Sequence, residues 1–216
     1  MRALAFESSE RLGTVLAIGC HADDIEIGCG GTILRLAELH PEAHVRWVVL
    51  SGDGGRAGEA RRSAEDFLAG FASSEIVVEG FRDGFFPYEG GKVKEFFERL
   101  KGDVSPDLIL THQRADLHQD HRLVCELTWN TFRDHLIFEY EVPKYDGDFG
   151  SPNVFVHLSE AIAARKVELI LSHFESQLDR RWFTDDLFHA LLRLRGMESN
   201  APERRAEAFY CRKLVI

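Results

Sequence analysis

The sequence lacks several features that would assign it to common protein classes. No apolar run approaches the roughly 20 residues that cross a membrane, and the N-terminus carries no charged segment followed by an apolar one. The four cysteines are scattered without a CxxC pair, which favours reduced thiols in a cytoplasmic protein. The net charge is −10, which argues against binding to a nucleic-acid backbone. We therefore expect a soluble, acidic, cytoplasmic protein.

The chain also lacks internal repeats and low-complexity segments, and its 216 residues suffice for one domain, residues 1–216, with a full core. Strand-like and helix-like segments alternate along it. This alternation predicts an α/β fold in which helices cover both faces of a mostly parallel sheet. The expected strands lie at residues 15–18, 45–50, 76–78, 107–111, 137–142, 154–158 and, as a strand-like tail, 208–216. The first expected helix begins near residue 33. Further helices are expected at 59–71, 93–100, about 122–134, 160–174 and 185–195.

The chain is organised around residues 14–32, TVLAIGCHADDIEIGCGGT. An apolar run of buried-strand type, residues 15–18, leads directly into His21, Asp23 and Asp24. A glycine-rich turn follows, and we expect a helix after it. Three ionisable groups at the end of a buried strand would be costly to desolvate without a counter-charge such as a metal ion.

A second polar cluster follows the expected strand 107–111 and contains His118, Asp120 and His121. In open parallel sheets, sites form beyond the carboxyl ends of the strands, at the point where strand order reverses. The first strand and the fourth are the usual neighbours at that point. The two clusters should therefore face each other across one crevice.

Two imidazoles and one carboxylate are a typical hydrolytic zinc site, and the same set can hold ferrous iron. We assign His21, Asp24 and His121 as the ligands. Asp23 is left as a general base for water, and His118 as an acid or oxyanion donor. Asp120 could hold the ring of His118 or of a ligand histidine in one tautomer. This set predicts metal-assisted hydrolysis of an amide or ester.

Other residues near these motifs have two readings each. Arg56, expected in the loop after the second strand, could contact a sugar hydroxyl or be a solvated arginine. His112 could support the site or be structural, and the aromatic segment 85–88 could stack on a sugar or pack on itself. Cys20 and Cys29 are expected as buried, small apolar groups. The loop 143–152 is a candidate substrate loop, and the lengths of the loops around 80–91 and 143–153 would decide between small and bulky substrates.

The motifs HADDIEIGCGGT at 21–32 and DLHQDHR at 116–122 resemble those of the LmbE-like, or PIG-L, family of zinc-dependent N-acetylglucosaminyl deacetylases. Two further elements are similar to family motifs. One is Arg62-x-x-Glu65 with Ala69, and the other is Lys166 with His173 and the pair Ser176-Gln177. Two positions depart from the usual pattern: Ala22 replaces a proline, and the late motif reads HFESQ rather than H-x-SQ.

The resemblance implies a three-layer Rossmann-like fold and the same roles for His21, Asp23, Asp24, His118 and His121, with Asp120 supporting His118. It implies a zinc enzyme, with Fe²⁺ as the alternative ion, that removes the N-acetyl group from an N-acetylglucosamine-type sugar or glycoconjugate. Two alternatives are an amidase of a bulkier acyl or thiol conjugate and a non-catalytic sugar- or metal-binding protein. The expected partner is a small amino-sugar substrate, and homo-oligomers are common among such enzymes.

Overall fold

The computed structural model describes residues 12–215. Within this range no helix is long and apolar enough to cross a membrane. The strands are β1 (Thr14–His21), β2 (His44–Ser51), β3 (Ser73–Val78), β4 (Leu108–His112), β5 (Leu136–Tyr140), β6 (Val154–His157) and β7 (Ala206–Tyr210). The α-helices are α1 (Asp24–Leu39), α2 (Gly54–Leu68), α3 (Gly90–Asp103), α4 (Gln119–Thr131), α5 (Glu160–His173) and α6 (Asp185–Glu198). Two short 3₁₀ helices are η1 (Phe86–Tyr88) and η2 (Glu175–Gln177).

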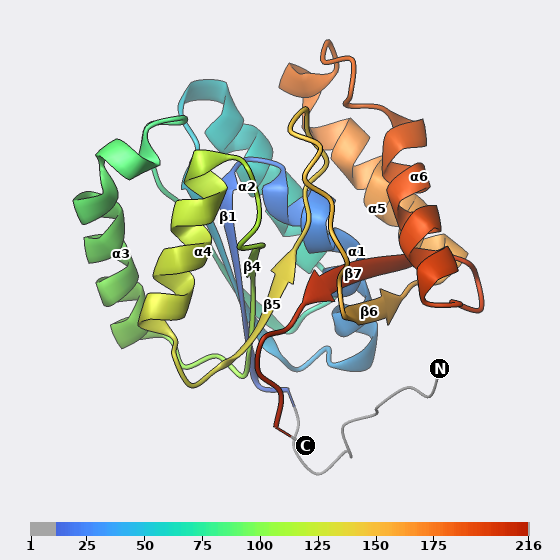
Figure 1. The fold of residues 1–216 in the computed structure, drawn as a ribbon, viewed down its shortest axis with the longest axis horizontal. Helices are drawn as coiled ribbons and strands as arrows, with labels where there is room; N and C mark the ends of the chain where they lie inside the picture. Colours follow the sequence, from blue (N-terminus) through green and yellow to red (C-terminus); the bar gives the residue numbers. More distant parts are fainter. Residues whose placement is uncertain (1–11, 216) are drawn as a thin grey trace.

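The strands form one seven-stranded sheet in the order β3-β2-β1-β4-β5-β7-β6 (Figure 1). The first five of these strands pair in parallel, and β7 pairs antiparallel with both β5 and β6. The order reverses between β1 and β4, as predicted. The predicted strand-like tail 208–216 is wrong beyond Tyr210, because the chain leaves the sheet there; Ile216 lies outside the described residues.

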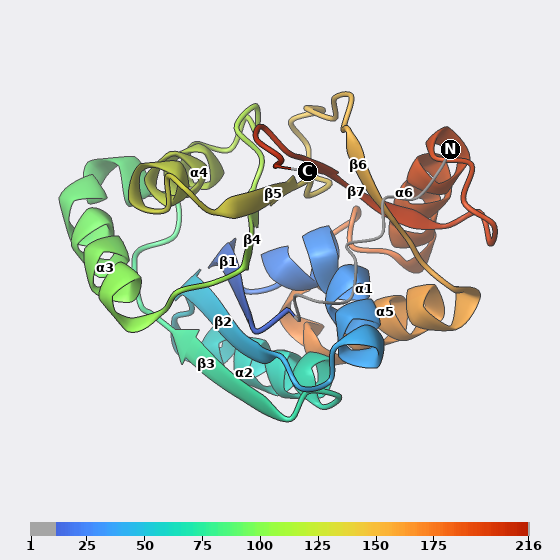
Figure 2. The ribbon, with the colours of Figure 1, turned by 90° about the horizontal axis from the view of Figure 1, so that it is seen from below.

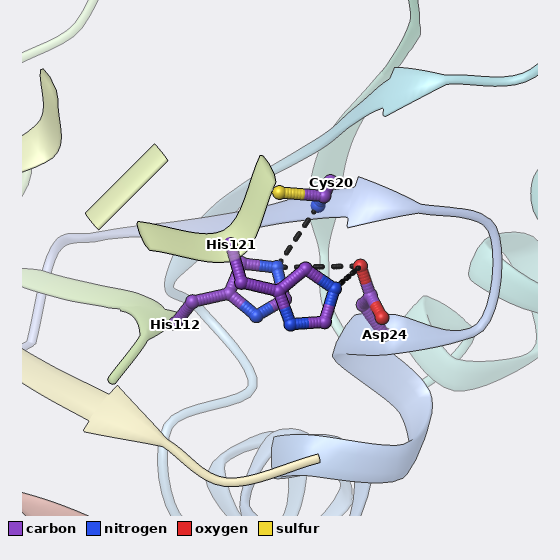
Figure 3. A group of neighbouring side chains, drawn as sticks. All are labelled: Cys20, Asp24, His112 and His121. Atoms are coloured by element: carbon purple, nitrogen blue, oxygen red, sulfur yellow. Dashed lines mark hydrogen bonds and ion pairs between the residues drawn. The ribbon is translucent and has the colours of Figure 1, made fainter. Parts of the chain in front are cut away.

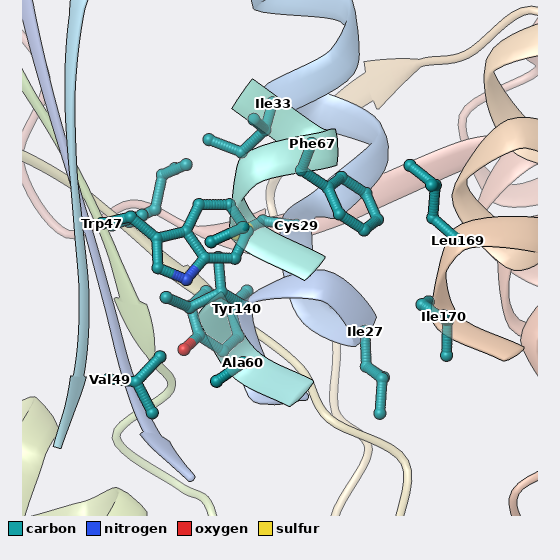
Figure 4. Close-up of a cluster of buried hydrophobic side chains, with 14 of the residues drawn as sticks. Ile27, Cys29, Ile33, Trp47, Val49, Ala60, Phe67, Tyr140, Leu169 and Ile170 are labelled. Atoms are coloured by element: carbon teal, nitrogen blue, oxygen red, sulfur yellow. The ribbon is translucent and has the colours of Figure 1, made fainter. Parts of the chain in front are cut away.

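Helices cover both faces of the sheet, as Figure 2 shows from below. Helices α3 and α4 pack on the face that carries Leu16 and Ile18 of β1. Helices α1, α2, α5 and α6 pack on the opposite face, around Trp47 and Phe67 (Figure 4). Since β1 is covered on both sides, its residues from Val15 to His21 are all buried, which explains the unbroken apolar run.

Helix α1 begins earlier than predicted, at Asp24 rather than after the glycines. The glycines lie inside the helix because its neighbours approach too closely for side chains. A Cβ at Gly28 would lie 2.2 Å from the Tyr140 ring, and one at Gly31 would lie 2.5 Å from Leu158. Cys29, between them, has non-helical angles (φ −146°, ψ 15°), so the helix is kinked there.

Candidate metal centre

The two predicted polar clusters meet at the carboxyl edge of the sheet, where β1 and β4 separate. These strands pair only as far as Ala17 and Leu110. Beyond that register, the end of β1 delivers His21, and the start of α1 delivers Asp24. The first turn of α4 delivers His121 from the other side. All three side chains are buried, and they lie together at the point that strand order predicted.

The three predicted ligands form a nearly regular triangle. His21 Nδ1 lies 3.3 Å from His121 Nε2 and 3.4 Å from Asp24 Oδ2, and the third side, His121 Nε2 to Asp24 Oδ2, is 3.5 Å. Ligand atoms in a tetrahedral zinc site with bonds of about 2.1 Å lie about 3.4 Å apart. The residues therefore fit one tetrahedral ion, with the fourth position left for solvent or substrate.

Two buried carboxylates hold the ligand imidazoles at their other nitrogen atoms. His21 Nε2 lies 3.2 Å from Asp120 Oδ2, and His121 Nδ1 lies 2.9 Å from Asp116 Oδ2. A ring that donates from one nitrogen keeps the lone pair of the other for a metal. The nitrogens left free in this way, His21 Nδ1 and His121 Nε2, are the corners of the triangle.

The structure gives Asp120 a different partner from the one that the resemblance implies. Its carboxylate contacts the predicted ligand His21, and it also accepts the N–H groups of Gly84 and Phe86, at 2.7 and 3.2 Å. Only its backbone N–H turns to His118, donating to Nδ1 at 3.3 Å. This bond places the proton of a neutral His118 on Nε2, where it can be donated.

Asp23 occupies the turn between β1 and α1 with φ of 100°, in the left-handed region that non-glycine residues rarely adopt. Arg56 holds this turn by donating to the Ala22 carbonyl oxygen and lies 3.4 Å from Asp23 Oδ2. Arg56 belongs to the first turn of α2, so the prediction of a loop position is wrong. Its contact with Asp23 nevertheless places it at the site.

Burial and neighbouring charges shift the pKa values of the adjacent residues Asp23 and Asp24 in opposite directions. Burial would raise the pKa of Asp24, but the imidazoles of His121 and His112 hold it well below its ordinary value. Burial, reinforced by the Asp24 carboxylate, raises the pKa of the neighbouring Asp23. Burial also lowers the pKa of His121 to about 4, which favours the neutral ligand form. Asp24 is thus suited to hold a cation and Asp23 to accept a proton.

His112 lies against the ligands at the end of β4. Its ring stacks on His121 with centroids 3.9 Å apart, and its Nε2 accepts the Cys20 N–H at 3.0 Å (Figure 3). The ligand atoms of Cys20, Asp24, His112 and His121 all lie within 4.8 Å of one another. Of the two readings for His112, the contacts favour support of the site. Cys20 and Cys29 are buried, and burial raises the pKa of both thiols, as expected of apolar-like cysteines.

Sequence reasoning missed two acidic residues at the site, Asp83 and Asp116. Asp83 lies in the loop after β3, with Oδ1 3.0 Å from His21 Nε2, and its side chain is 55% exposed. That loop also leaves the carboxyl end of a parallel strand, which could have pointed to it. Of the aromatic residues in this loop, Phe86 is buried, whereas Phe85 and Tyr88 are exposed.

The residues matched to the two further family motifs lie around the site and do not contact the predicted ligands. His173 pairs with Asp66 at 2.8 Å, away from the ligands. Ser176 donates its N–H and hydroxyl to Glu59 at 2.9 and 2.6 Å. Arg62 and Glu65, matched to a family motif, are exposed on α2. The same spacing recurs at Arg56 and Glu59, and these are the residues that contact Asp23 and Ser176.

The fold and this site define the class of the protein. It is a Rossmann-like α/β protein with a His₂Asp cluster that fits one metal ion, placed where strand order reverses.

Comparisons with known proteins agree with this class. Residues 16–132 match the family described as PIG-L: GlcNAc-PI de-N-acetylase. The chain belongs to this family of deacetylases. It is 28% identical over 180 residues to the uncharacterized deacetylase YaiS of Escherichia coli K12, covering 79% of this chain and 95% of YaiS.

Several solved structures share the fold, including the following two. The conserved protein TT1542 from Thermus thermophilus has a TM-score of 0.71 at 21% identity, with 95% of this chain and 96% of that chain covered. The N,N'-diacetylchitobiose deacetylase from Pyrococcus horikoshii has a TM-score of 0.69 at 19% identity, with 93% and 84% covered.

Proposed function

We propose that the protein is a zinc-dependent deacetylase that removes the acetyl group from an N-acetylglucosamine-type sugar or glycoconjugate. The observation that carries the proposal is the triangle of His21 Nδ1, Asp24 Oδ2 and His121 Nε2, with sides of 3.3–3.5 Å. Membership of the PIG-L family supports the reaction, and the chitobiose deacetylase of the same fold supports the type of substrate.

When bound, zinc would polarise the acetyl carbonyl and acidify water, which is the chemistry that amide hydrolysis needs at neutral pH. Asp23 accepts the proton of the attacking water. The Nε2–H of His118 donates to the oxygen that becomes negative as the water adds to the carbonyl carbon. The C–N bond then breaks, and Asp23 or His118 delivers a proton to the leaving amine, so that acetate and the free amino sugar are the products.

Two residues at the mouth of the site are suited to orient a sugar. The exposed carboxylate of Asp83 can accept hydrogen bonds from hydroxyl groups and lies beside His21 and His118. Arg56 can donate to hydroxyl oxygens while it holds Asp23 in place.

The test is acetate release from a panel of N-acetylated monosaccharides, disaccharides, nucleotide sugars and aryl or alkyl N-acetylglucosaminides. The protein is stripped with a chelator and reloaded with Zn²⁺ or Fe²⁺. We expect release that the chelator abolishes and Zn²⁺ restores. The variants Asp23→Asn and His118→Ala should keep the metal and lose on the order of 10²–10⁴-fold in turnover, with little change in KM.

Metal-loaded protein that releases no acetate from any member of the panel would contradict the proposal. Fe²⁺ restoring turnover where Zn²⁺ does not would contradict the assignment of zinc. Normal turnover in Asp23→Asn would contradict its role as the base.

A further inference from the structure

The carboxylate of Asp116 contacts two residues of the proposed site, one through each oxygen atom. Its Oδ2 lies 2.9 Å from His121 Nδ1, and its Oδ1 accepts the backbone N–H of His118 at 2.8 Å. One carboxylate therefore positions both a proposed ligand and the residue proposed to donate to the oxyanion. The Asp116 side chain has no exposed surface, so solvent cannot compensate its charge.

The cation that compensates Asp116 comes from a different part of the chain. Lys144 Nζ lies 3.0 Å from Asp116 Oδ1, 2.5 Å from Asp148 Oδ2 and 3.4 Å from the Val142 carbonyl oxygen. Each of the three ammonium N–H groups thus has an acceptor. The Lys144 side chain is only 11% exposed, which distinguishes this contact from a solvated surface ion pair.

The loop that carries Lys144 is anchored at two neighbouring points that follow the lysine in sequence. Asp148 Oδ2 accepts the Leu117 N–H at 2.7 Å, which fixes the loop to the segment before α4. Gly150 donates its N–H to Glu141 Oε1 at 3.4 Å, and its carbonyl oxygen accepts from Arg195 at 3.3 Å. Glu141 and Arg195 are themselves a buried, bidentate pair.

We propose that Lys144 is a positioning residue of the metal centre. By neutralising Asp116 it keeps the carboxylate aimed at His121 Nδ1, and Asp116 in turn holds His121 with Nε2 free for the metal. Without Lys144 the donors that remain to the buried carboxylate among residues 12–215 are the His118 N–H and the His121 ring, so the carboxylate can turn away and His121 loses its fixed orientation. The inference rests on the proposed role of His121 as a ligand.

The experiment compares zinc dissociation constants, measured by competition with a chromophoric chelator, in full-length wild-type protein and variants. Lys144→Met should weaken zinc binding by about tenfold, the lower range for loss of a group that orients a ligand. Lys144→Arg keeps the charge and should restore most of the affinity. Asp148→Asn removes one charge that anchors Lys144 but keeps an acceptor for Leu117 and leaves the ammonium group beside Asp116, so it should weaken zinc binding by less than Lys144→Met does. The exposed control Lys92→Met should have no effect.

A second readout follows the His121 ring itself in the zinc-loaded protein. The Nδ1–H proton of His121, hydrogen-bonded to Asp116, should give a downfield imidazole resonance in ¹H–¹⁵N spectra. Lys144→Met should shift or broaden this resonance, whereas Lys92→Met should not.

The zinc affinities distinguish failure of the inference about Lys144 from failure of the proposed function. Wild-type affinity in Lys144→Met would overturn the inference, and so would an affinity in Lys144→Arg as low as that in Lys144→Met, since the positive charge beside Asp116 would then not account for the effect. Failure of the wild-type protein to bind zinc would instead overturn the proposed function on which the inference rests.

Discussion

At the scale of single residues, the imidazoles of His21, His118 and His121 are each assigned a role at one nitrogen and held at the other. His21 and His121 are held by the buried carboxylates Asp120 and Asp116. His118 is held by a backbone N–H, which leaves its other nitrogen as a donor. The same residue type therefore serves as ligand or as donor according to what contacts its second nitrogen.

Glu26, two residues after Asp24, is a buried acid for which the proposed reaction has no use. It is fully buried in α1, and neither of its carboxylate oxygens has a hydrogen-bond partner among residues 12–215. Burial is the main cause that raises its pKa from 4.5 to about 7. The native protein then keeps the Glu26 proton up to about pH 7, whereas the unfolded chain loses it near pH 4.5. Because the native state binds more protons in this window, the free energy of unfolding falls as the pH rises through it.

We therefore expect Glu26→Gln, which stays neutral, to be more stable than wild type at high pH. The difference should be about 3 kcal/mol at pH 8 and less than about 1 kcal/mol at pH 5, since one pKa unit corresponds to 1.36 kcal/mol. Urea denaturation of metal-free protein at several pH values measures it. Glu38→Gln, an exposed position on the same helix, is the control. A constant difference between Glu26→Gln and wild type from pH 5 to pH 8 would show that Glu26 does not titrate in this range.

At the scale of secondary-structure elements, α1 connects the metal centre to the rest of the fold. Its first residue is the proposed ligand Asp24, and its middle is fixed by Glu207 of β7, which accepts the N–H groups of Gly31 and Thr32 at 2.8 and 2.6 Å. The buried Lys166 of α5 neutralises Glu207 at 2.5 Å. The kink at Cys29 brings this part of the helix against β7 and α5, and it requires residues without side chains at the points of closest approach.

Gly28→Ala tests this requirement. The added methyl would lie 2.2 Å from a Tyr140 ring whose hydroxyl is bonded to the Ile18 carbonyl oxygen at 2.7 Å, so neither group can move freely. We expect a loss of about 1–3 kcal/mol or more in the free energy of unfolding, measured by urea denaturation. Gly102→Ala, in a helical position where a Cβ would meet nothing within 4 Å, should leave stability unchanged or raise it by up to about 1 kcal/mol. Equal stability of the two variants would contradict the packing argument.

At the scale of the whole molecule, the proposed ligands come from parts of the chain that are far apart in sequence. His21 and Asp24 belong to the first strand and helix, whereas His121 lies 100 residues beyond His21. An ion held by all three stabilises the folded state alone, because the unfolded chain does not hold these groups together.

Zinc should therefore raise the thermal midpoint of unfolding, and excess chelator should lower it again. At a free zinc concentration 100 times Kd the stabilisation is about 2.7 kcal/mol. Calorimetry with and without zinc measures the shift, and His121→Ala should show almost none. A shift of wild-type size in His121→Ala would contradict its assignment as a ligand.

The sequence by itself predicted the parallel α/β sheet, the reversal of strand order between β1 and β4, and the meeting of His21, Asp24 and His121. These follow from local patterns: buried strands have recognisable apolar runs, and the carboxyl ends of adjacent parallel strands must share one edge. It predicted element boundaries less well. The start of α1 depends on how closely Tyr140 and Leu158 approach its glycines, and the local sequence does not contain that information.

Only the tertiary structure decided which residues support the ligands. Asp120 turns to His21 and not to His118, Arg56 reaches Asp23 from the first turn of α2, and Asp83, Asp116 and Lys144 join the site from three loops. These contacts form when loops dock on the edge of the sheet, through hydrogen bonds between side chains with no fixed spacing in sequence. Residues that hold a metal directly are restricted to a few types in short motifs. Residues that hold those ligands need only be polar and close, and proximity is a property of the folded chain.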